Sequence, residues 1–231
     1  MRPAATYRAK VTFAALLWLV FVVGLSVGAL TVPVYTSALT QVLGVPGSAG
    51  LSAADVVKLT GQVRASVADA EYDQLPSEWR GRPAFDETAV SHLRDVRAVM
   101  SGARIATGVV ALLLALHVGW CVARRRLGIL RSGMVWGAGA VTALVALAGV
   151  AGLLDFSSLF AAFHGLFFAQ GTWTFPYDSL LIRLFPERFW SVSAAVWAGL
   201  SLLGAGALAL AARLLRATAG REYASRTPNN V

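Results

Sequence analysis

Four long runs of apolar residues dominate the pattern of the chain. They cover residues 11–32, 105–123, 133–154 and 190–212. Each run is close to the roughly 20 residues that a helix needs to cross the hydrocarbon core of a bilayer, so we expect four transmembrane helices. We expect the first to be retained rather than cleaved as a signal peptide, because it is longer than the apolar core of such a peptide. Two longer segments, 33–104 and 155–189, separate the runs.

Basic residues flank the apolar runs unevenly. The segments before the first run, between the second and third, and after the fourth hold more than half of the 20 basic residues but only one of the 12 acids. Basic flanks of membrane helices stay in the cytoplasm, so the sequence predicts cytoplasmic termini and outward-facing loops at 33–104 and 155–189. We interpret the net charge of +8 as a topology signal, and we expect no nucleic-acid partner.

The composition agrees with a membrane protein. Hydrophobic residues make up 57% of the 231 residues and charged residues 14%, and the mean hydropathy is +0.64. A single cysteine, Cys121, excludes an internal disulfide and a multi-cysteine metal site. We therefore predict one all-α integral membrane domain over residues 1–231, with a mainly helical first outer loop and interfacial helices in the second.

The first outer loop has two helical patterns with a break between them. Ser52 is a suitable N-cap, and apolar residues recur after it at helical spacing, at Val56, Leu59, Val63 and Val67. The stretch "EYDQLPSEWRGRPAF" breaks the helix through its prolines and glycine. A second helix, capped by Asp86, is then expected to run without interruption into the second apolar run.

The second outer loop is unusually apolar. The stretch "FSSLFAAFHGLFF" gives a helix with a wide apolar face, "TFPYD" breaks it, and "DSLLIRLFP" predicts a short helix capped by Asp178 and ended before Pro186. Helices of this kind lie at the membrane surface, where Trp173, Trp190 and Tyr177 suit the headgroup level. An interfacial anchor explains the aromatic residues but leaves the ionisable His164 unexplained, since such groups near lipid are costly.

Two histidines, His92 and His164, lie in the predicted outer loops. Imidazole titrates near neutrality, which favours acid–base chemistry. The chain has no G-x-S-x-G serine and no outward cysteine, so a covalent acyl-enzyme is not favoured and the substrate would bring its own nucleophile. A solvated ion pair of His92 with Asp95, and a metal site of both histidines with Asp95 and Asp178, are alternatives. No known ligand spacing supports a metal. The third histidine, His117, is expected to pack between helices.

The stretches "DETAVSHLRDVRAVM" and "FHGLFFAQGTWTFPYDSLLIRLFPERFW" together resemble a family of bacterial four-helix integral membrane proteins that includes the lipoprotein intramolecular transacylases. The four-span layout and the large first outer loop also fit. Members of that family convert diacylglyceryl lipoproteins to the lyso form by moving the sn-2 acyl chain to the α-amine of the N-terminal cysteine. By position, the family's proposed catalytic histidines match His92 and His164.

The resemblance implies a site at the outer face of the bacterial cytoplasmic membrane. His164 is expected to take the amine proton, and His92 to stabilise the oxyanion or protonate the leaving alkoxide; these roles are interchangeable. The expected supporting residues are Asp95, Asp178, Arg94, Arg97 and Arg183, and the expected substrate-binding residues are Phe163, Phe167, Trp173 and Tyr177. The two rings should lie within about 10 Å of each other to act on one ester.

The expected partners are diacylglyceryl lipoproteins and membrane lipid, without a cofactor, and the sequence makes no prediction of oligomeric state. Two other functions compete with the acyltransferase. One is a non-catalytic membrane protein that binds lipoprotein or lipid through its aromatic outer loop. The other is a metal-dependent membrane hydrolase. Transport is not favoured, because no span carries a charged residue in mid-membrane.

Overall fold

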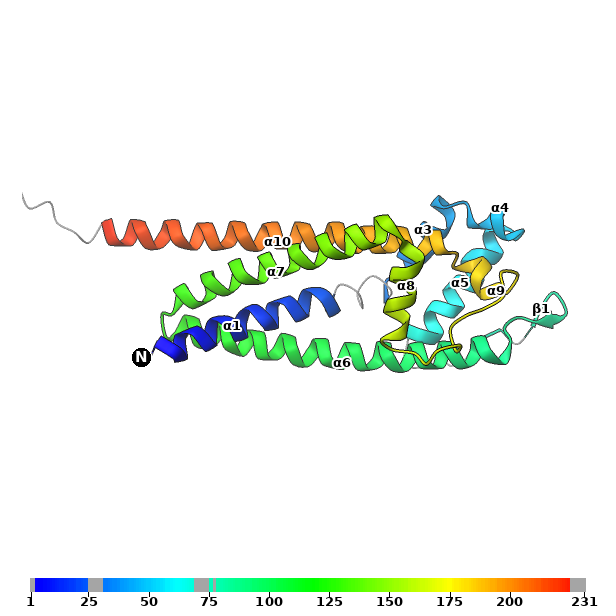
Figure 1. Cartoon of the computed structure of the whole chain (residues 1–231), viewed down its shortest axis with the longest axis horizontal. Helices are drawn as coiled ribbons and strands as arrows, with labels where there is room; N and C mark the ends of the chain where they lie inside the picture. The colour runs from blue at the N-terminus through cyan, green and yellow to red at the C-terminus, as the bar shows by residue number, and fades with distance from the viewer. Residues whose placement is uncertain (1–2, 25–30, 69–74, 77, 225–231) are drawn as a thin grey trace, which may run out of the picture. The chain divides into compact units, whose positions relative to one another are not determined.

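A computed structural model describes residues 3–24, 31–68, 75–76 and 78–224, and the chain is mainly helical over these residues (Figure 1). Its residues gather into two compact units. The first unit contains residues 1–25, 106–147 and 198–231, and the second contains residues 26–105 and 148–197. The prediction of a single membrane domain with spans at the stated boundaries stays a prediction.

Among the described residues, four helices are long and apolar enough to cross a membrane, as the four apolar runs predict. The first is Ala5–Gly24, which combines most of α1 (Pro3–Leu19) with the π-helical turn η1 (Val20–Gly24). The other three are α6 (Glu87–Ala123), α7 (Leu127–Leu154) and residues Glu187–Arg216 of α10 (Glu187–Ala224). The part of the first run at residues 25–30 lies outside the described residues. Helix α6 has 37 residues, because the amphipathic helix that begins in the first outer loop continues into the second apolar run as expected.

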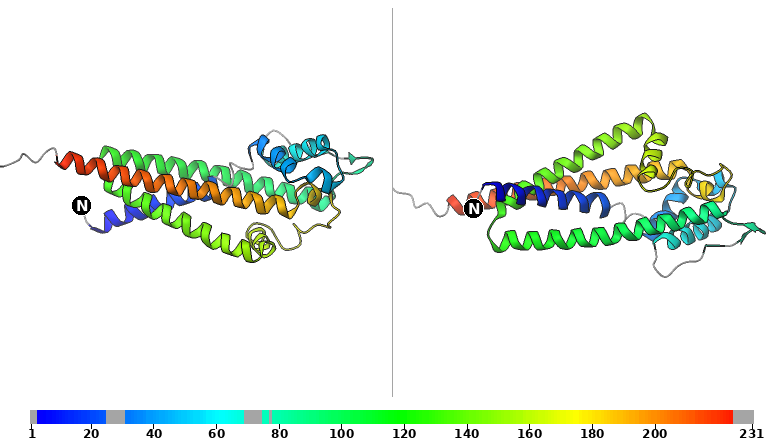
Figure 2. Two further views of the ribbon diagram at one scale, coloured as in Figure 1. Left: turned by 90° about the horizontal axis from the view of Figure 1, so that it is seen from above. Right: turned by 60° about the horizontal axis from the view of Figure 1, so that its bottom comes forward.

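In the first unit, α1 packs closely on α7 (Figures 1 and 2). The Phe13 ring is 1% exposed and fills the space that a side chain at Gly133 would need. Phe21 of η1 meets Gly204 of α10 in the same way. Small residues let helices approach closely inside a membrane, so these glycines fix where the large rings of the first helix fit.

The second unit contains the two predicted outer segments. Besides parts of α6, α7 and α10, it contains α3 (Pro33–Val42), α4 (Val45–Ala49), α5 (Ala53–Ala68), β1 (Glu78–Trp79), β2 (Arg82–Pro83), α8 (Phe156–Gly165) and α9 (Leu180–Leu184). One buried core joins both segments: Leu59 of α5, Leu93 of α6 and Leu184 of α9 belong to it. Burial of this apolar surface is the main force that holds the two segments together.

Side-chain caps explain where these helices begin. The Ser52 hydroxyl accepts from the Asp55 amide at 3.1 Å, and Asp86 Oδ1 accepts from the Ala89 amide at 2.7 Å, as predicted. The prediction for α9 is wrong by one residue. Its cap is Ser179, whose hydroxyl accepts from the Ile182 amide at 3.3 Å. Because α9 begins at Leu180, Asp178 lies one position too early to reach the free amides of the first turn.

A short hairpin occupies the break between the two helices of the first outer segment. Strands β1 and β2 pair antiparallel, with Glu78 opposite Pro83. Both residues of the connecting turn have positive φ, 54° at Arg80 and 75° at Gly81, which is the geometry that matches the twist of a two-residue hairpin. The Arg80 guanidinium lies 5.6 Å from the Trp79 ring and 3.9 Å from Asp55. The sequence predicted the break, not the hairpin.

Candidate active site

A cavity of about 210 Å³ lies inside the second unit, and both outer histidines line it. Most of its lining is apolar or aromatic and comes from α5, α6, α8, α9, α10 and the segment between α8 and α9. The aliphatic part includes Val63, Val67, Val96, Val99, Met100 and Leu181, and the aromatic part includes Phe160, Phe163, Phe167, Phe168, Trp173, Phe175, Phe185, Phe189 and Trp190. Such a lining suits an apolar ligand that meets a few polar groups.

The two histidine rings face each other across this cavity. The ring centroids of His92 and His164 are 6.2 Å apart, and the ring planes differ by 28°. This distance is within the expected limit. His92 comes from near the start of α6 and His164 from the last turn of α8, so segments far apart in the sequence supply the pair.

His164 is held in a defined orientation. Its Nδ1 lies 2.9 Å from the carbonyl oxygen of Phe160, four residues earlier on α8. Because a carbonyl only accepts hydrogen bonds, Nδ1 carries the proton and Nε2 of the neutral ring keeps a free lone pair. Burial lowers the pKa of His164 below its ordinary value, while the hydrogen bond to Phe160 acts in the opposite direction. The ring is therefore neutral and basic at Nε2 near pH 7.

His92 is more deeply buried, with 7% of its surface exposed. Its ring lies 4.9 Å from Phe168 and 5.5 Å from Phe175, measured between centroids. Within the described part of the chain, its buried Nδ1 has no hydrogen-bond partner. A buried polar atom without a partner is costly, and such atoms concentrate where a protein binds or transforms a ligand.

Aromatic side chains enclose His164. The Phe160 and Trp173 rings lie 3.9 and 5.0 Å from it, and Phe163 and Phe167 also line the cavity. Three of the four predicted substrate-binding residues, Phe163, Phe167 and Trp173, are thus beside the histidines. The fourth, Tyr177, is 95% exposed and lies outside the lining.

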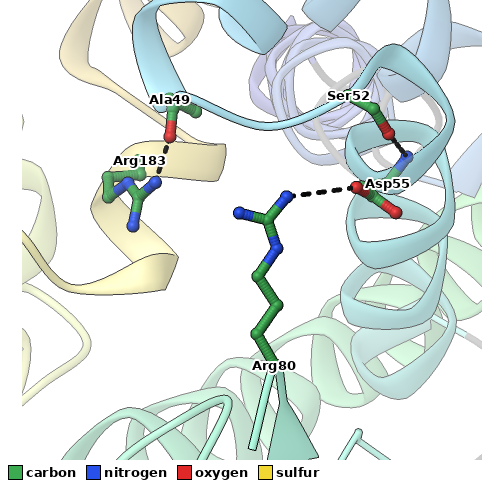
Figure 3. A network of polar contacts seen from close by, with 5 residues as sticks. All are labelled: Ala49, Ser52, Asp55, Arg80 and Arg183. Atoms are coloured by element: carbon green, nitrogen blue, oxygen red, sulfur yellow. Dashed lines mark hydrogen bonds and ion pairs between the residues drawn. The ribbon is translucent and has the colours of Figure 1, made fainter. Parts of the chain in front are cut away.

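The predicted supporting residues lie outside the lining of the histidine cavity. Asp95 and Arg94 are exposed on α6. Arg97 donates to the Ser66 carbonyl at 3.4 Å. Arg183 donates to the Ala49 carbonyl (Figure 3), and with Asp178 it lines a different cavity. The structure therefore brings the two histidines together without bringing these charged residues to the same cavity, and their supporting roles stay predictions.

The sequence interpretation missed Arg64. This residue of α5 lines the histidine cavity, and its Nη1 donates to the Thr31 carbonyl at 3.4 Å. A signal for it exists in the helical pattern. Arg64 directly follows Val63 and lies three residues before Val67, so it borders the apolar face, whereas Lys58 lies on the opposite side and is exposed. A cation at the edge of a buried face is placed to reach into the interior.

The candidate metal ligands named from the sequence do not gather into a metal centre. Among the described residues, no three His, Cys, Asp or Glu side chains gather closely enough to hold an ion. Asp178, one of the four proposed ligands, lines the other cavity. His117 belongs to the first unit, where its ring lies 5.5 Å from the Phe13 ring. This packing agrees with the structural role expected for it.

Comparison with known proteins gives one family and one fold. The model of the family described as "lipoprotein intramolecular transacylase Lit" matches residues 11–190. The solved structure of the membrane integral lipoprotein intramolecular transacylase Lit from Bacillus cereus matches with a TM-score of 0.83 at 13% identity, covering 95% of this chain and 100% of that one. A search among curated proteins finds no match.

Two variants of the same Bacillus cereus protein, with a histidine replaced by arginine or by alanine, also match. Their TM-scores are 0.77 and 0.76 at 13% and 14% identity, and they cover 95% and 94% of this chain and 95% and 96% of their own. At this identity the likeness shows the fold. Together with the four apolar helices, it identifies the chain as a multi-pass membrane protein.

Proposed function

Since the chain belongs to the lipoprotein intramolecular transacylase family, we propose that it moves the sn-2 acyl chain of a diacylglyceryl lipoprotein to the α-amine of the lipoprotein's N-terminal cysteine. The observation that carries this proposal is the pair of histidine rings 6.2 Å apart in an apolar cavity. An ester and an amine placed between the rings can meet a base on one side and a hydrogen-bond donor on the other. The product is a lyso-form lipoprotein.

The substrate supplies the nucleophile. The amine nitrogen attacks the ester carbonyl carbon, and His164 Nε2 accepts the proton that the amine loses. The tetrahedral intermediate then collapses, the bond from carbon to the sn-2 oxygen breaks, and that oxygen receives a proton as the amide forms. No water is consumed and no covalent enzyme intermediate is needed. Because amine and ester belong to one molecule, holding them in contact supplies much of the rate.

His92 acts on the oxygen side of the reaction. A ring N–H stabilises the oxyanion, or the ring passes a proton to the departing alkoxide and regains one from His164. Arg64, the cation on the described lining, adds positive charge where the oxyanion forms. Asp95, three residues after His92 on α6, is the proposed orienting carboxylate. The aromatic walls favour the acyl chain and exclude water, which would otherwise hydrolyse the ester.

The proposed location is the outer leaflet of the bacterial cytoplasmic membrane. Basic residues at both ends of the chain and between α6 and α7 support cytoplasmic termini by the positive-inside rule. The second unit then faces the extracytoplasmic side, where mature lipoproteins are anchored. Reaction with a labelling reagent that does not cross membranes, at a cysteine introduced in place of exposed Glu87, tests this orientation.

Mass spectrometry of a reporter lipoprotein tests the activity. In cells that lack other lipoprotein N-acylation, we expect the chain to yield an N-acyl, mono-acylglyceryl reporter. We expect His92→Ala and His164→Ala to abolish this product. His117→Ala is a matched control, because this third histidine packs in the first unit and should leave the product unchanged. An unmodified diacylglyceryl reporter beside well-expressed wild-type protein would refute the proposal.

A non-catalytic lipoprotein- or lipid-binding role is the second candidate. The observation that favours it is the aromatic lining of the histidine cavity, which suits an acyl chain whether or not a reaction follows. The two candidates differ in the wild-type protein, which modifies the reporter only if it is an enzyme. A binding protein would retain a photoreactive lipid in wild-type and His164→Ala protein alike, and the reporter would stay unmodified in both.

A further inference from the structure

A second cavity lies beside the first in the second unit. Its volume is about 290 Å³, and Leu181 of α9 lines both cavities. One side comes from the end of the hairpin and the start of α6, which include Trp79, Pro83 and Asp86. The other side comes from Asp178, the residue before the α9 cap, and from Arg183 on α9. Leu181 is therefore the residue that the two linings share.

The lining of the second cavity is more polar than that of the first. Two carboxylates, Asp86 and Asp178, and the Arg183 guanidinium lie on it, whereas the histidine cavity has Arg64 as its charged lining residue within the described chain. Two of these groups are held in place. Asp86 caps α6 through the Ala89 amide at 2.7 Å, and Arg183 donates to the Ala49 carbonyl (Figure 3). The cavity is thus a polar recess with fixed edges.

We propose that this second cavity holds the polypeptide residues that follow the lipidated cysteine of the substrate. The inference rests on the proposed function. The substrate joins an apolar acyl chain to a polar polypeptide, and the reacting amine and ester lie at the junction. When the junction is between the histidines, the polypeptide must leave the aromatic cavity, because its amide groups would lack hydrogen-bond partners there. The adjoining polar recess, whose lining shares Leu181 with the histidine cavity, offers space of suitable chemistry.

The charges of the recess give it a preference among polypeptides. Two carboxylates outnumber one guanidinium on the lining, and the guanidinium is already bound to a backbone carbonyl. The neighbouring Arg80 lies 3.9 Å from Asp55 and forms an ion pair with it (Figure 3). A basic side chain shortly after the cysteine is therefore favoured over an acidic one. Asp86 and Asp178 are exposed, so we expect a difference of about two- to fivefold in KM at low salt.

Blocking the recess tests the proposal. The native Cys121 is fully buried, so Pro83→Cys, at an exposed residue of the recess lining, introduces the accessible thiol that a bulky maleimide can modify. Two substrates are compared with the full-length protein in detergent: a diacylglyceryl cysteine amide with no further residues, and a lipopeptide with four more residues. Modification should raise KM for the lipopeptide about tenfold or more and leave KM for the cysteine amide unchanged. Glu87→Cys, one residue from Asp86 and outside the lining, is the matched control. Its modification should change KM for both substrates by the same factor.

The outcomes separate the two proposals. If the unmodified protein converts neither substrate, the proposed function fails. If it converts both and the modification affects them equally, or affects neither, the recess does not hold the polypeptide although the function stands. A charge exchange gives an independent measurement: Asp178→Lys should reverse the preference between lipopeptides with lysine and with glutamate after the cysteine. An unchanged preference would count against the proposal.

Discussion

At the scale of single residues, the hydrogen bond between His164 and the Phe160 carbonyl has the clearest chemical consequence. It places the proton on Nδ1 and leaves Nε2 as the basic nitrogen. Burial among aromatic rings lowers the pKa of the ring, so His164 stays neutral at a pH where a free imidazole begins to take up a proton. A base in this state is ready to accept a proton from the substrate amine at neutral pH.

The lowered pKa of His164 predicts a pH dependence. The base must be neutral, so kcat falls as the pH drops through the pKa of His164. We therefore expect the acidic limb of the pH profile, where kcat decreases, to lie below the ordinary histidine pKa of about 6.5. Phe160→Gly removes a covering ring and keeps the carbonyl, so it should move this limb toward higher pH. Measurement of kcat between about pH 4.5 and 8 for both proteins tests this. An acidic limb at or above about 6.5 in the wild-type protein would contradict it.

The position of Arg64 on the lining of the histidine cavity leads to a second prediction for a single residue, an effect of its charge on kcat. If its charge stabilises the oxyanion, Arg64→Met should lower kcat on the order of 10²-fold, as loss of one such donor does elsewhere, and Arg64→Lys should restore part of it. Lys58→Met, on the exposed side of the same helix, is the control and should leave kcat unchanged. Binding of an anionic phosphonate analogue of the ester separates this role from a structural one. Equal affinity in Arg64→Met and wild-type protein would rule out the oxyanion role.

At the scale of elements, close contacts between glycine and phenylalanine position the first helix. Phe13 occupies the space above Gly133 of α7, and Phe21 that above Gly204 of α10. Phe13 and Leu17 also share a buried cluster with Cys121, Ile129 and Leu130. Helix association in a membrane depends on such fits, since lipid chains are as apolar as leucine and the hydrophobic effect contributes little.

Substitution of Gly133 tests this packing. Gly133→Val places side-chain atoms where the Phe13 ring lies, so it should lower the free energy of unfolding by about 1–3 kcal/mol, the usual cost of overpacking. Gly139→Val on the same helix has open space around its Cα and serves as the control. Thermal unfolding of the detergent-solubilised proteins compares the two. Equal unfolding temperatures for both variants would show that the contact does not matter.

At the scale of the whole molecule, the second unit joins two segments that the sequence separates by two apolar runs. Leu59 and Leu93 from the first segment share one buried core with Leu184 and Phe189 from the second. Polar links support this core: Arg183 reaches the Ala49 carbonyl, and Tyr35 donates to Ser193 at 2.9 Å. These links tie α4 to α9 and α3 to α10. Helix α8 joins the unit through aromatic contacts, such as the Phe160 ring 6.0 Å from the Trp190 ring, so the distance between the two histidines depends on both kinds of packing.

Much of this organisation could be predicted from the sequence. The four apolar runs, the Ser52 and Asp86 caps and the continuous α6 follow from local rules of length, periodicity and capping, which depend on residues a few positions apart. The hairpin and the cap at Ser179 were missed for a local reason. Short turns and single-residue shifts at helix ends leave weak signals, because several polar residues can serve in each position.

The sequence by itself predicted the four long apolar helices, the helical faces of the two outer segments and, through family resemblance, the pair His92 and His164. Tertiary structure alone decided which other side chains meet that pair: Arg64 lines the cavity, Arg183 binds a backbone carbonyl, and Tyr177 is exposed outside the cavity. The physical reason is that helical periodicity assigns a residue to a face, whereas the neighbours of a long side chain depend on which distant segment packs against that face.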